Sequence, residues 1–387
     1  MKSHYYRFGK RYGCETFYIK SAHNQHPFLP YTNMSLPTEI HQIILKNAPL
    51  KDVNLKLGEA DSTFEIVTKP FNADDVKEGQ VLVKLKLISN DPTQRGWIQK
   101  GLDPRRMYVA PVLEGDRMMA VGLAEVVLSK NDTYKEGDLV LAMVGWGDYA
   151  VLNAEQVRLK INAQPGVPLL AYLSALGMTG LTAYFGTIKV GQLQAGQTII
   201  VSAASGATGL MVVQVAKHIV GAKRVIGFAG SDEKCKLVEL LGADKCINYK
   251  LATDLRAELD KALDGEFADV YYDNVGGEIL DLCLSRVKQF GRVVACGAIS
   301  GYNDHLKMAV TRWGEIITNR LTVQGFIVMD FAKDFPEGLA ALAKGLMEGK
   351  IKDELEVVDI KGDLTKIPEV WHRLFDGKGP GKLITKP

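Results

Sequence analysis

The sequence has few cysteines and histidines, and their positions exclude several kinds of site. None of the five cysteines forms a Cys-x-x-Cys pair, so neither a disulfide framework nor a structural zinc site is indicated. Residues 42–217 contain no Cys and no His, so a catalytic zinc ion would lack its usual ligands there. We therefore predict no metal, and a reducing compartment, with the cytoplasm as the expected location. The cysteines are Cys14, Cys235, Cys246, Cys283 and Cys296.

Long apolar runs and a strong charge imbalance are also missing. No apolar run approaches the roughly 20 residues that a membrane-spanning helix needs. The 47 Lys and Arg against 45 Asp and Glu give a formal net charge of +2, which predicts neither a nucleic-acid nor a membrane partner. The 387 residues, 47% hydrophobic and 24% charged, suit a globular protein of two ordinary domains.

Residues 1–33 differ from the rest of the chain because they are basic, with Glu15 as the only acid. A basic, acid-poor N-terminus can be an organelle transit peptide, but the usual Arg- and Ser-rich amphipathic pattern is missing. We predict a disordered extension, with organelle targeting as the minor alternative. The basic residues are Lys2, Arg7, Lys10, Arg11 and Lys20.

The remaining chain changes its pattern near residue 170. Before that point, short β-like runs separated by Gly, Pro and Asp predict a mostly β domain over residues 34–169. After it, strand-like and helix-like runs alternate, which predicts a parallel doubly wound sheet over 170–345. We expect residues 346–387 to return to the first domain. The predicted strands are 40–45, 81–89, 118–128, 138–144, 148–151, 198–202, 224–228, 268–273, 292–296, 321–328, 355–359 and 382–385, and the predicted helices are 210–220, 232–241, 255–263, 278–290 and 337–347.

A short turn between a buried strand and a helix is the most informative motif. It reads Val-Ser-Ala-Ala-Ser-Gly-Ala-Thr-Gly-Leu over residues 201–210. Gly206 and Gly209 lack a Cβ, so a pyrophosphate can approach the backbone, where the helix N-terminus offers free N–H groups and a positive dipole end. The strand–turn–helix context favours a dinucleotide site over an ordinary small-residue loop.

The end of the second strand indicates which dinucleotide binds. An NAD site usually has an acidic residue there, which bonds the ribose 2′-OH. The strand at 224–228 instead runs into Ala229-Gly230-Ser231, and Lys234 follows in the first turn of the next helix. The missing acid and the available base favour NADPH over NADH, while a solvated helix lysine is the alternative for Lys234.

Several segments together resemble the medium-chain dehydrogenase/reductase superfamily, in its zinc-independent branch of leukotriene/prostaglandin reductases and alkenal double-bond reductases. The resemblance covers about residues 36–387. It implies an α/β fold with a Rossmann-type doubly wound parallel sheet beside a GroES-like, mostly β domain, the active site between them, and a homodimer. Besides the glycine motif, it rests on Met-Thr-Gly-Leu-Thr-Ala-Tyr at 178–184, Gly-Ser-Asp-Glu-Lys at 230–234, Asn-Tyr-Lys at 248–250, Asp-Asn-Val-Gly-Gly at 273–277, Cys-Gly-Ala-Ile-Ser-Gly-Tyr-Asn at 296–303 and Gly-Phe-Ile-Val at 325–328.

The same resemblance implies which residues bind NADPH. Lys234 and Tyr249 match the family's clamp on the 2′-phosphate, and residues 325–328 match a strand whose backbone contacts the nicotinamide carboxamide. The implied cofactor-binding residues are Met178, Thr179, Gly206, Ala207, Thr208, Gly209, Ser231, Lys234, Tyr249, Asn274, Cys296, Gly297, Ile299, Ser300, Tyr302, Phe326 and Val328.

Two positions depart from the family pattern. A common Asp-Pro-Tyr-Met-Arg sequence is replaced by Asp-Pro-Thr-Gln-Arg at 91–95, so Thr93 stands where a pocket tyrosine is expected. Gly379 occupies a position where the family often has a cofactor-binding Asn. Both departures bear more on substrate preference than on cofactor use.

The resemblance implies NADPH-dependent reduction of the C=C bond of small α,β-unsaturated aldehydes and ketones, by hydride transfer to the β-carbon. Tyr302 is the implied catalytic residue, as a hydrogen-bond donor to the carbonyl oxygen or a proton donor to the α-carbon, and it lines the substrate pocket with Thr93. A tyrosine that only shapes the pocket is the alternative. Two other functions stay open: a quinone reductase of the same superfamily, and a non-catalytic NADPH-binding protein.

Overall fold

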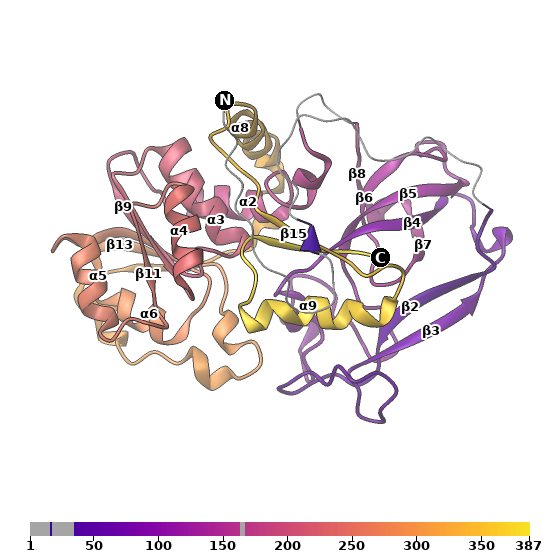
Figure 1. The fold of residues 1–387 in the computed structure, drawn as a ribbon, viewed down its shortest axis with the longest axis horizontal. Helices are drawn as coiled ribbons and strands as arrows, with labels where there is room; N and C mark the ends of the chain where they lie inside the picture. The colour runs from indigo at the N-terminus through magenta and orange to yellow at the C-terminus, as the bar shows by residue number, and fades with distance from the viewer. Residues whose placement is uncertain (1–15, 18–34, 163–166) are drawn as a thin grey trace.

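The computed structural model describes residues 16–17, 35–162 and 167–387, which form two domains lying side by side (Figure 1). The β domain is built on an eight-stranded sheet of order β1-β15-β16-β4-β5-β6-β8, with β7 paired to β4, and on the separate β2–β3 hairpin. Because β16 pairs antiparallel with β4, the C-terminus belongs to this domain. Its strands are β1 (Thr16–Phe17), β2 (Glu39–Leu45), β3 (Phe64–Pro70), β4 (Gln80–Ser89), β5 (Val121–Ser129), β6 (Leu139–Met143), β7 (Tyr149–Asn153), β8 (Val157–Lys160), β15 (Leu355–Asp359) and β16 (Lys382–Lys386).

Aromatic rings from distant parts of the chain fill the centre of the β domain. Trp371 reaches it from helix α9 (Ile367–Asp376) and lies 5.6 Å from Trp146 and 6.0 Å from Phe64 between ring centroids. All three side chains are fully buried. Large buried rings contribute much of a core's stability, so Trp371 fixes α9 to this domain, to which the flanking strands β15 and β16 also belong.

The α/β domain contains a six-stranded parallel sheet of order β11-β10-β9-β12-β13-β14. In sequence order its strands lie 3-2-1-4-5-6, the arrangement in which dinucleotides bind outside the carboxyl ends of the central strands. All four residues of β9 are buried, as expected where helices cover both faces. The strands are β9 (Thr198–Val201), β10 (Arg224–Ala229), β11 (Lys245–Asn248), β12 (Ala268–Asp273), β13 (Val287–Ala295) and β14 (Thr322–Gly325).

Helices cover this sheet, and α2 packs against both α3 and α8 beside the β domain (Figure 1). Helix α3 runs without a break into a π-helical segment over Val215–Val220. The α-helices of this domain are α2 (Met178–Phe185), α3 (Ala207–Gln214), α4 (Asp232–Leu240), α5 (Leu255–Leu263), α6 (Gly277–Leu284), α7 (Trp313–Thr318) and α8 (Phe335–Met347). The predicted fold class is therefore confirmed.

Two predicted elements were wrong in their extent. The helix expected over 278–290 ends at Leu284, because residues from Val287 onward join the sheet as β13, where Val287 pairs with Ala268 of β12. The strand expected over 321–328 is limited to β14, after which Val328 begins a 3-10 helix. The prediction of disorder for residues 1–33 lies outside the described residues, except that Thr16–Phe17 pairs with β15.

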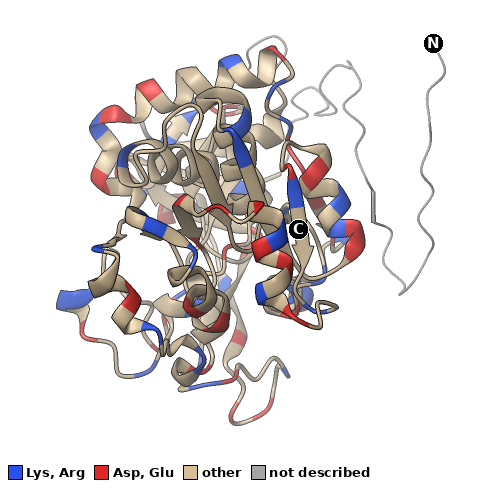
Figure 2. Cartoon of the chain, turned by 90° about the vertical axis from the view of Figure 1, so that its left-hand side faces the viewer, with Lys and Arg blue, Asp and Glu red and all other residues tan. Residues whose placement is uncertain are grey.

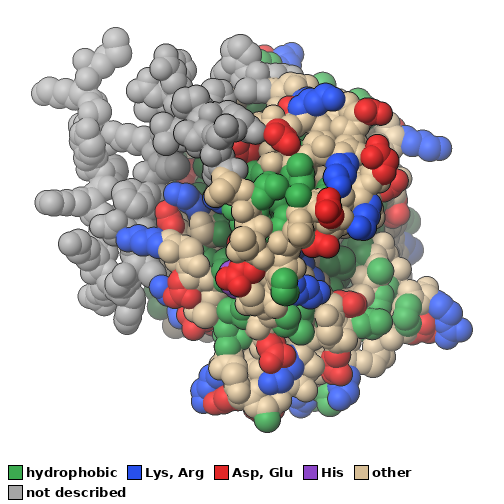
Figure 3. Space-filling view, turned by 90° about the vertical axis from the view of Figure 1, so that its right-hand side faces the viewer, with side chains coloured by type: hydrophobic (Ala, Val, Ile, Leu, Met, Phe, Trp, Pro, Cys, Tyr) green, Lys and Arg blue, Asp and Glu red, His purple; other side chains and the backbone are tan. Residues whose placement is uncertain are grey.

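Positions of acidic and basic residues alternate along the ribbon of the α/β domain (Figure 2), in keeping with the small net charge. On the β-domain side, exposed hydrophobic side chains are likewise interspersed with charged ones (Figure 3). In the part of the chain that the structure describes, no helix is both long and apolar enough to cross a membrane.

Candidate cofactor-binding and active site

The glycine motif forms the turn between β9 and α3. Helix α3 begins at Ala207, after Gly206, so Thr208 and Gly209 lie in its first turn. A Cβ on Gly209 would lie 2.2 Å from the carbonyl oxygen of Ala203, so only glycine lets the helix approach the turn this closely. The motif thus brings its four predicted residues to the helix N-terminus, a geometry that suits a pyrophosphate.

The C-terminal loop of the β domain closes over this turn. The backbone N–H of Gly381 donates to the carbonyl of Ser205 at 2.8 Å. Thr179, in the first turn of α2, and Ala207 line a small cavity together with Gly381. The predicted residues Met178 and Thr179 therefore lie close to the glycine motif at the boundary between the domains.

Three side chains gather at the end of β10, where an NAD site would place its acid. A Cβ on Gly230 would lie 3.2 Å from Tyr249 Oη and 3.3 Å from Lys250 Cε. Ser231 caps α4 by accepting from the backbone N–H of Lys234 at 3.3 Å. The pKa of Lys234 is lowered by its burial and, next, by the positive charge of Lys250.

This arrangement suits the 2′-phosphate of NADPH, because two neighbouring ammonium groups repel one another until a dianion lies between them. The ammonium of Lys234 also donates to the carbonyl of Gly377, in the same C-terminal loop. Sequence reasoning did not assign Lys250. Its position directly after Tyr249 was the available signal.

The turn after β12 is held by its own side chains. Asp273 accepts hydrogen bonds from Tyr271 Oη at 2.7 Å and from the backbone N–H groups of Val275 and Gly276 at 3.0 Å. Burial raises the pKa of Asp273, although these donors oppose the rise. Asn274 Nδ2 donates to the carbonyl of Ser202 at 2.8 Å, so this predicted cofactor ligand uses its amide to join β12 to β9.

The segment after β13 places Tyr302 at the carboxyl end of the sheet. Its hydroxyl accepts from the backbone N–H of Ala298 at 3.4 Å and lies 3.1 Å from where a Cβ on Gly297 would be. Burial raises the pKa of Tyr302 to about 12, with smaller contributions from Cys296 and Tyr108. The hydroxyl therefore keeps its proton at neutral pH. Burial likewise raises the pKa of Cys296 to about 11, so its thiol is a poor nucleophile.

The remaining predicted cofactor-binding residues lie in or near the segment 296–303. Ile299 opens a 3-10 turn, and Ser300 Oγ donates to the carbonyl of Val275 at 2.5 Å, which ties the segment to the turn after β12. Phe326 packs against Gly186 and lies 6.2 Å from Phe331 between ring centroids. Val328 follows at the start of the next 3-10 helix.

On the β-domain side, Thr93 is joined to a tyrosine that sequence reasoning missed. Thr93 Oγ1 shares a short hydrogen bond with Tyr108 Oη, which also accepts from Trp97 Nε1 at 3.0 Å. Because Tyr108 is among the groups that raise the pKa of Tyr302, the two phenols are within electrostatic range across the domain boundary. Thr93 replaces the tyrosine expected from the family pattern, and Tyr108 places a tyrosine hydroxyl next to it.

Among the described residues, no cluster of three or more His, Cys, Asp or Glu side chains could hold a metal ion. His218 bonds through Nε2 to the carbonyl of Leu241 at 3.1 Å, and His305 is exposed. That the protein works without a metal stays a prediction.

Known proteins are similar to this chain in sequence and in fold. Residues 54–159 match the family described as N-terminal domain of oxidoreductase, and residues 207–344 match the family described as zinc-binding dehydrogenase. The 2-alkenal reductase (NADP(+)-dependent) of Nicotiana tabacum is 36% identical over 89% of this chain and 96% of its own length. Prostaglandin reductase 1 of Bos taurus is 36% identical over 84% of this chain and 94% of its own.

A solved structure is similar as well. CurA from Vibrio vulnificus in complex with NADPH superposes with a TM-score of 0.78 at 31% identity, covering 89% of this chain and 98% of CurA. The fold, the sheet order and the glycine turn define a dinucleotide-dependent oxidoreductase. The chain belongs to the medium-chain dehydrogenase/reductase superfamily, in its zinc-independent branch of NADPH-dependent reductases.

Proposed function

We propose that this protein reduces the C=C bond of α,β-unsaturated aldehydes and ketones with NADPH. The observation that carries the proposal is the partly buried side chain of Tyr302, whose hydroxyl lies beside Gly297 and Ala298, just after the carboxyl end of β13, and whose pKa is raised to about 12. NADPH, when bound, supplies the hydride that the β-carbon receives. Relatives named 2-alkenal reductase and prostaglandin reductase, about a third identical over most of the chain, support this substrate class.

In this proposal Tyr302 acts on the substrate's carbonyl oxygen. As the β-carbon is reduced, negative charge develops on that oxygen, and a hydrogen-bond donor placed beforehand stabilises it, after which the α-carbon takes a proton from water to give the saturated product. Tyr302 suits this role because a hydroxyl that stays protonated keeps donating. Tyr108, held by Thr93 and Trp97, lies on the other side of the domain boundary, where it orients the substrate.

In the same proposal, two groups of residues bind NADPH. Gly206, Ala207, Thr208 and Gly209 receive the pyrophosphate at the N-terminus of α3. Lys234, Tyr249 and Lys250 receive the 2′-phosphate, with Ser231 fixing the start of α4.

We further propose a homodimer that pairs through β14. This strand is the last of its sheet, and all four of its residues are exposed. Trp313 and Ile317 on the preceding helix α7 are exposed as well. An unpaired edge beside large apolar side chains favours association with a second copy about a twofold axis.

Product identification tests the proposed reaction. Purified protein is incubated with NADPH and trans-2-nonenal, and the product is identified by mass spectrometry. We expect saturated nonanal, with NADH a much poorer reductant than NADPH. Allylic alcohol would show carbonyl reduction instead, and turnover of quinones without turnover of enals would show a quinone reductase. Binding of NADPH with no turnover of either would show a non-catalytic binding protein.

A further inference from the structure

A buried arginine connects the two domains next to Tyr302. Arg95 lies on the short helix α1 (Gln94–Trp97), and its side chain is 0% exposed. Its Nε donates to Asn303 Oδ1 at 2.9 Å, across the domain boundary and 208 residues further along the chain. Its NH2 group donates to the carbonyl of Lys51 at 2.6 Å. Asn303 directly follows Tyr302, so this contact holds the Tyr302 segment from the β-domain side.

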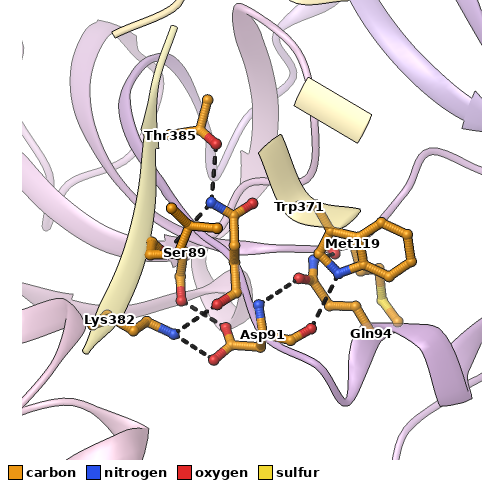
Figure 4. Close-up of polar contacts among 9 residues, drawn as sticks. Ser89, Asp91, Gln94, Met119, Trp371, Lys382 and Thr385 are labelled. Carbon is orange, nitrogen blue, oxygen red and sulfur yellow. Dashed lines mark hydrogen bonds and ion pairs between the residues drawn. The ribbon is translucent and has the colours of Figure 1, made fainter. Parts of the chain in front are cut away.

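The loop that carries Arg95 is itself fixed by several elements (Figure 4). Asp91 is ion-paired with Lys382 of β16 at 2.5 Å, and its carbonyl accepts from Trp371 Nε1 of α9 at 3.2 Å. Gln94 Nε2 donates to the carbonyl of Met119 at 2.8 Å. Because these contacts hold residues 91–94 in place, the guanidinium of Arg95 has a fixed position and can orient the groups to which it donates.

The burial of Arg95 is expected to lower the stability of the fold. Its guanidinium bonds only neutral acceptors, and its NH1 group has no hydrogen-bond partner among the described residues. Burial lowers the pKa of Arg95, and the negative charge of Asp52 offsets this only in part. A buried cation without a paired carboxylate destabilises a fold, so this arrangement calls for a functional reason.

We propose that Arg95 is a positioning residue, which holds Asn303 and thereby fixes the Tyr302 hydroxyl for its contact with the substrate. This proposal rests on the proposed function, since Tyr302 is the group that it positions. Arginine suits the task because its planar fork has only donors, so the Asn303 amide must turn its oxygen toward Arg95. Lysine keeps the charge but cannot span Asn303 and the Lys51 carbonyl together.

A set of variants tests the role through Tyr302. Asn303→Ala, Arg95→Lys and the double variant are compared with the wild type for kcat and KM with trans-2-nonenal and for the Kd of NADPH. A small misplacement of a reacting group costs one to two orders of magnitude in rate, so we expect each single variant to lose about tenfold in kcat. The double variant should be no slower than either single variant, because both remove the same contact. The Kd of NADPH should change less than about twofold, far below the rate effect.

Two further variants distinguish a loss of Tyr302 positioning from a general disturbance of the fold. In a Tyr302→Phe background, Asn303→Ala should cause no further loss of kcat, because Asn303 acts through the missing hydroxyl. Asn303→Asp keeps the acceptor oxygen and should retain most of the wild-type kcat. If Arg95→Lys fails to fold, the Asn303 variants carry the test, since Asn303 is only partly buried.

The outcomes distinguish this proposal from the proposed function. A wild-type protein that does not reduce enals contradicts the proposed function, and the role of Arg95 with it. A wild-type protein that is active, but whose Asn303→Ala variant keeps its kcat, contradicts the role of Arg95 alone. An equal loss of kcat in the wild-type and Tyr302→Phe backgrounds also contradicts it.

Discussion

The Tyr302 hydroxyl lies 3.1 Å from the point where a β-carbon on Gly297 would stand. Gly297→Ala therefore pushes the hydroxyl away by a few tenths of an ångström. We expect kcat for enal reduction to fall roughly three- to tenfold, because rate is sensitive to small misplacements of a reacting group. Steady-state kinetics measure the loss.

The matched control is Gly314→Ala, since a Cβ on Gly314 meets nothing within 4 Å. This variant should keep the wild-type rate. A Gly297→Ala protein as fast as the Gly314→Ala control would show that the position of the Tyr302 hydroxyl does not affect the reaction.

The raised pKa of Tyr302 predicts an unusual tolerance of alkaline pH. In the proposed role the protonated hydroxyl is the active form, so its contribution should be present below the pKa of about 12 and be lost only as the pH rises through that value. The ratio of wild-type to Tyr302→Phe kcat should stay constant from pH 7 to about pH 10.5. An ordinary tyrosine, with a pKa near 10, would be mostly ionised at that upper limit. A ratio that declines with a midpoint near pH 10 would contradict the burial argument.

Lys250 is expected to contribute to the choice of NADPH. A hydrogen bond to a charged group is worth about 1.5 to 3 kcal/mol, so Lys250→Gln should lower kcat/KM for NADPH at least tenfold and leave NADH almost unchanged. Lys234→Gln should act in the same direction. The control is Lys236, which is exposed and lies on α4, the helix that also carries Lys234. Lys236→Gln should leave kcat/KM for NADPH and for NADH unchanged. An unaltered NADPH preference in Lys250→Gln would remove this lysine from the phosphate site.

The β14 edge is expected to hold the dimer together. Val323→Lys places two like charges across the twofold axis, and sedimentation at micromolar concentration should shift from dimer to monomer. Leu159→Lys is a close control, because Leu159 lies on the last strand of the other sheet and is 44% exposed, against 45% for Val323. A wild-type monomer, or a Val323→Lys dimer, would contradict this interface.

Local sequence patterns were sufficient for most of the fold, and the exceptions have physical causes. Helix α5 begins and ends at the predicted residues, because Asp254 caps its start and a left-handed Asp264 follows its end. The second half of the predicted helix 278–290 was wrong because residues from Val287 pair with β12, a long-range contact that helical periodicity does not reveal. Helix α9 was missed although its apolar residues Ile367, Val370, Trp371 and Leu374 have the i, i+3, i+4, i+7 spacing of an amphipathic helix, so a local signal was present.

The candidate site likewise has residues that the local sequence predicts and residues that only the folded structure reveals. Residues within one turn, such as Gly206 and Gly209, could be proposed as cofactor contacts from spacing and from family resemblance. The roles that we propose for Tyr108, Arg95 and Lys250 could not, because they depend on contacts with Thr93, Asn303 and Gly230 that only the folded chain creates. Asn274 was predicted to bind the cofactor, but the structure shows its side-chain amide donating to the carbonyl of Ser202.

The most direct test of the proposed chemistry is the position of the transferred hydrogen. NADPH deuterated at C4, prepared separately on each face of the nicotinamide, is supplied with trans-2-nonenal, and the product is analysed by NMR. With one of the two reagents, we expect nonanal that carries deuterium on the carbon that was β to the carbonyl. Deuterium on the carbonyl carbon of an allylic alcohol would contradict the account.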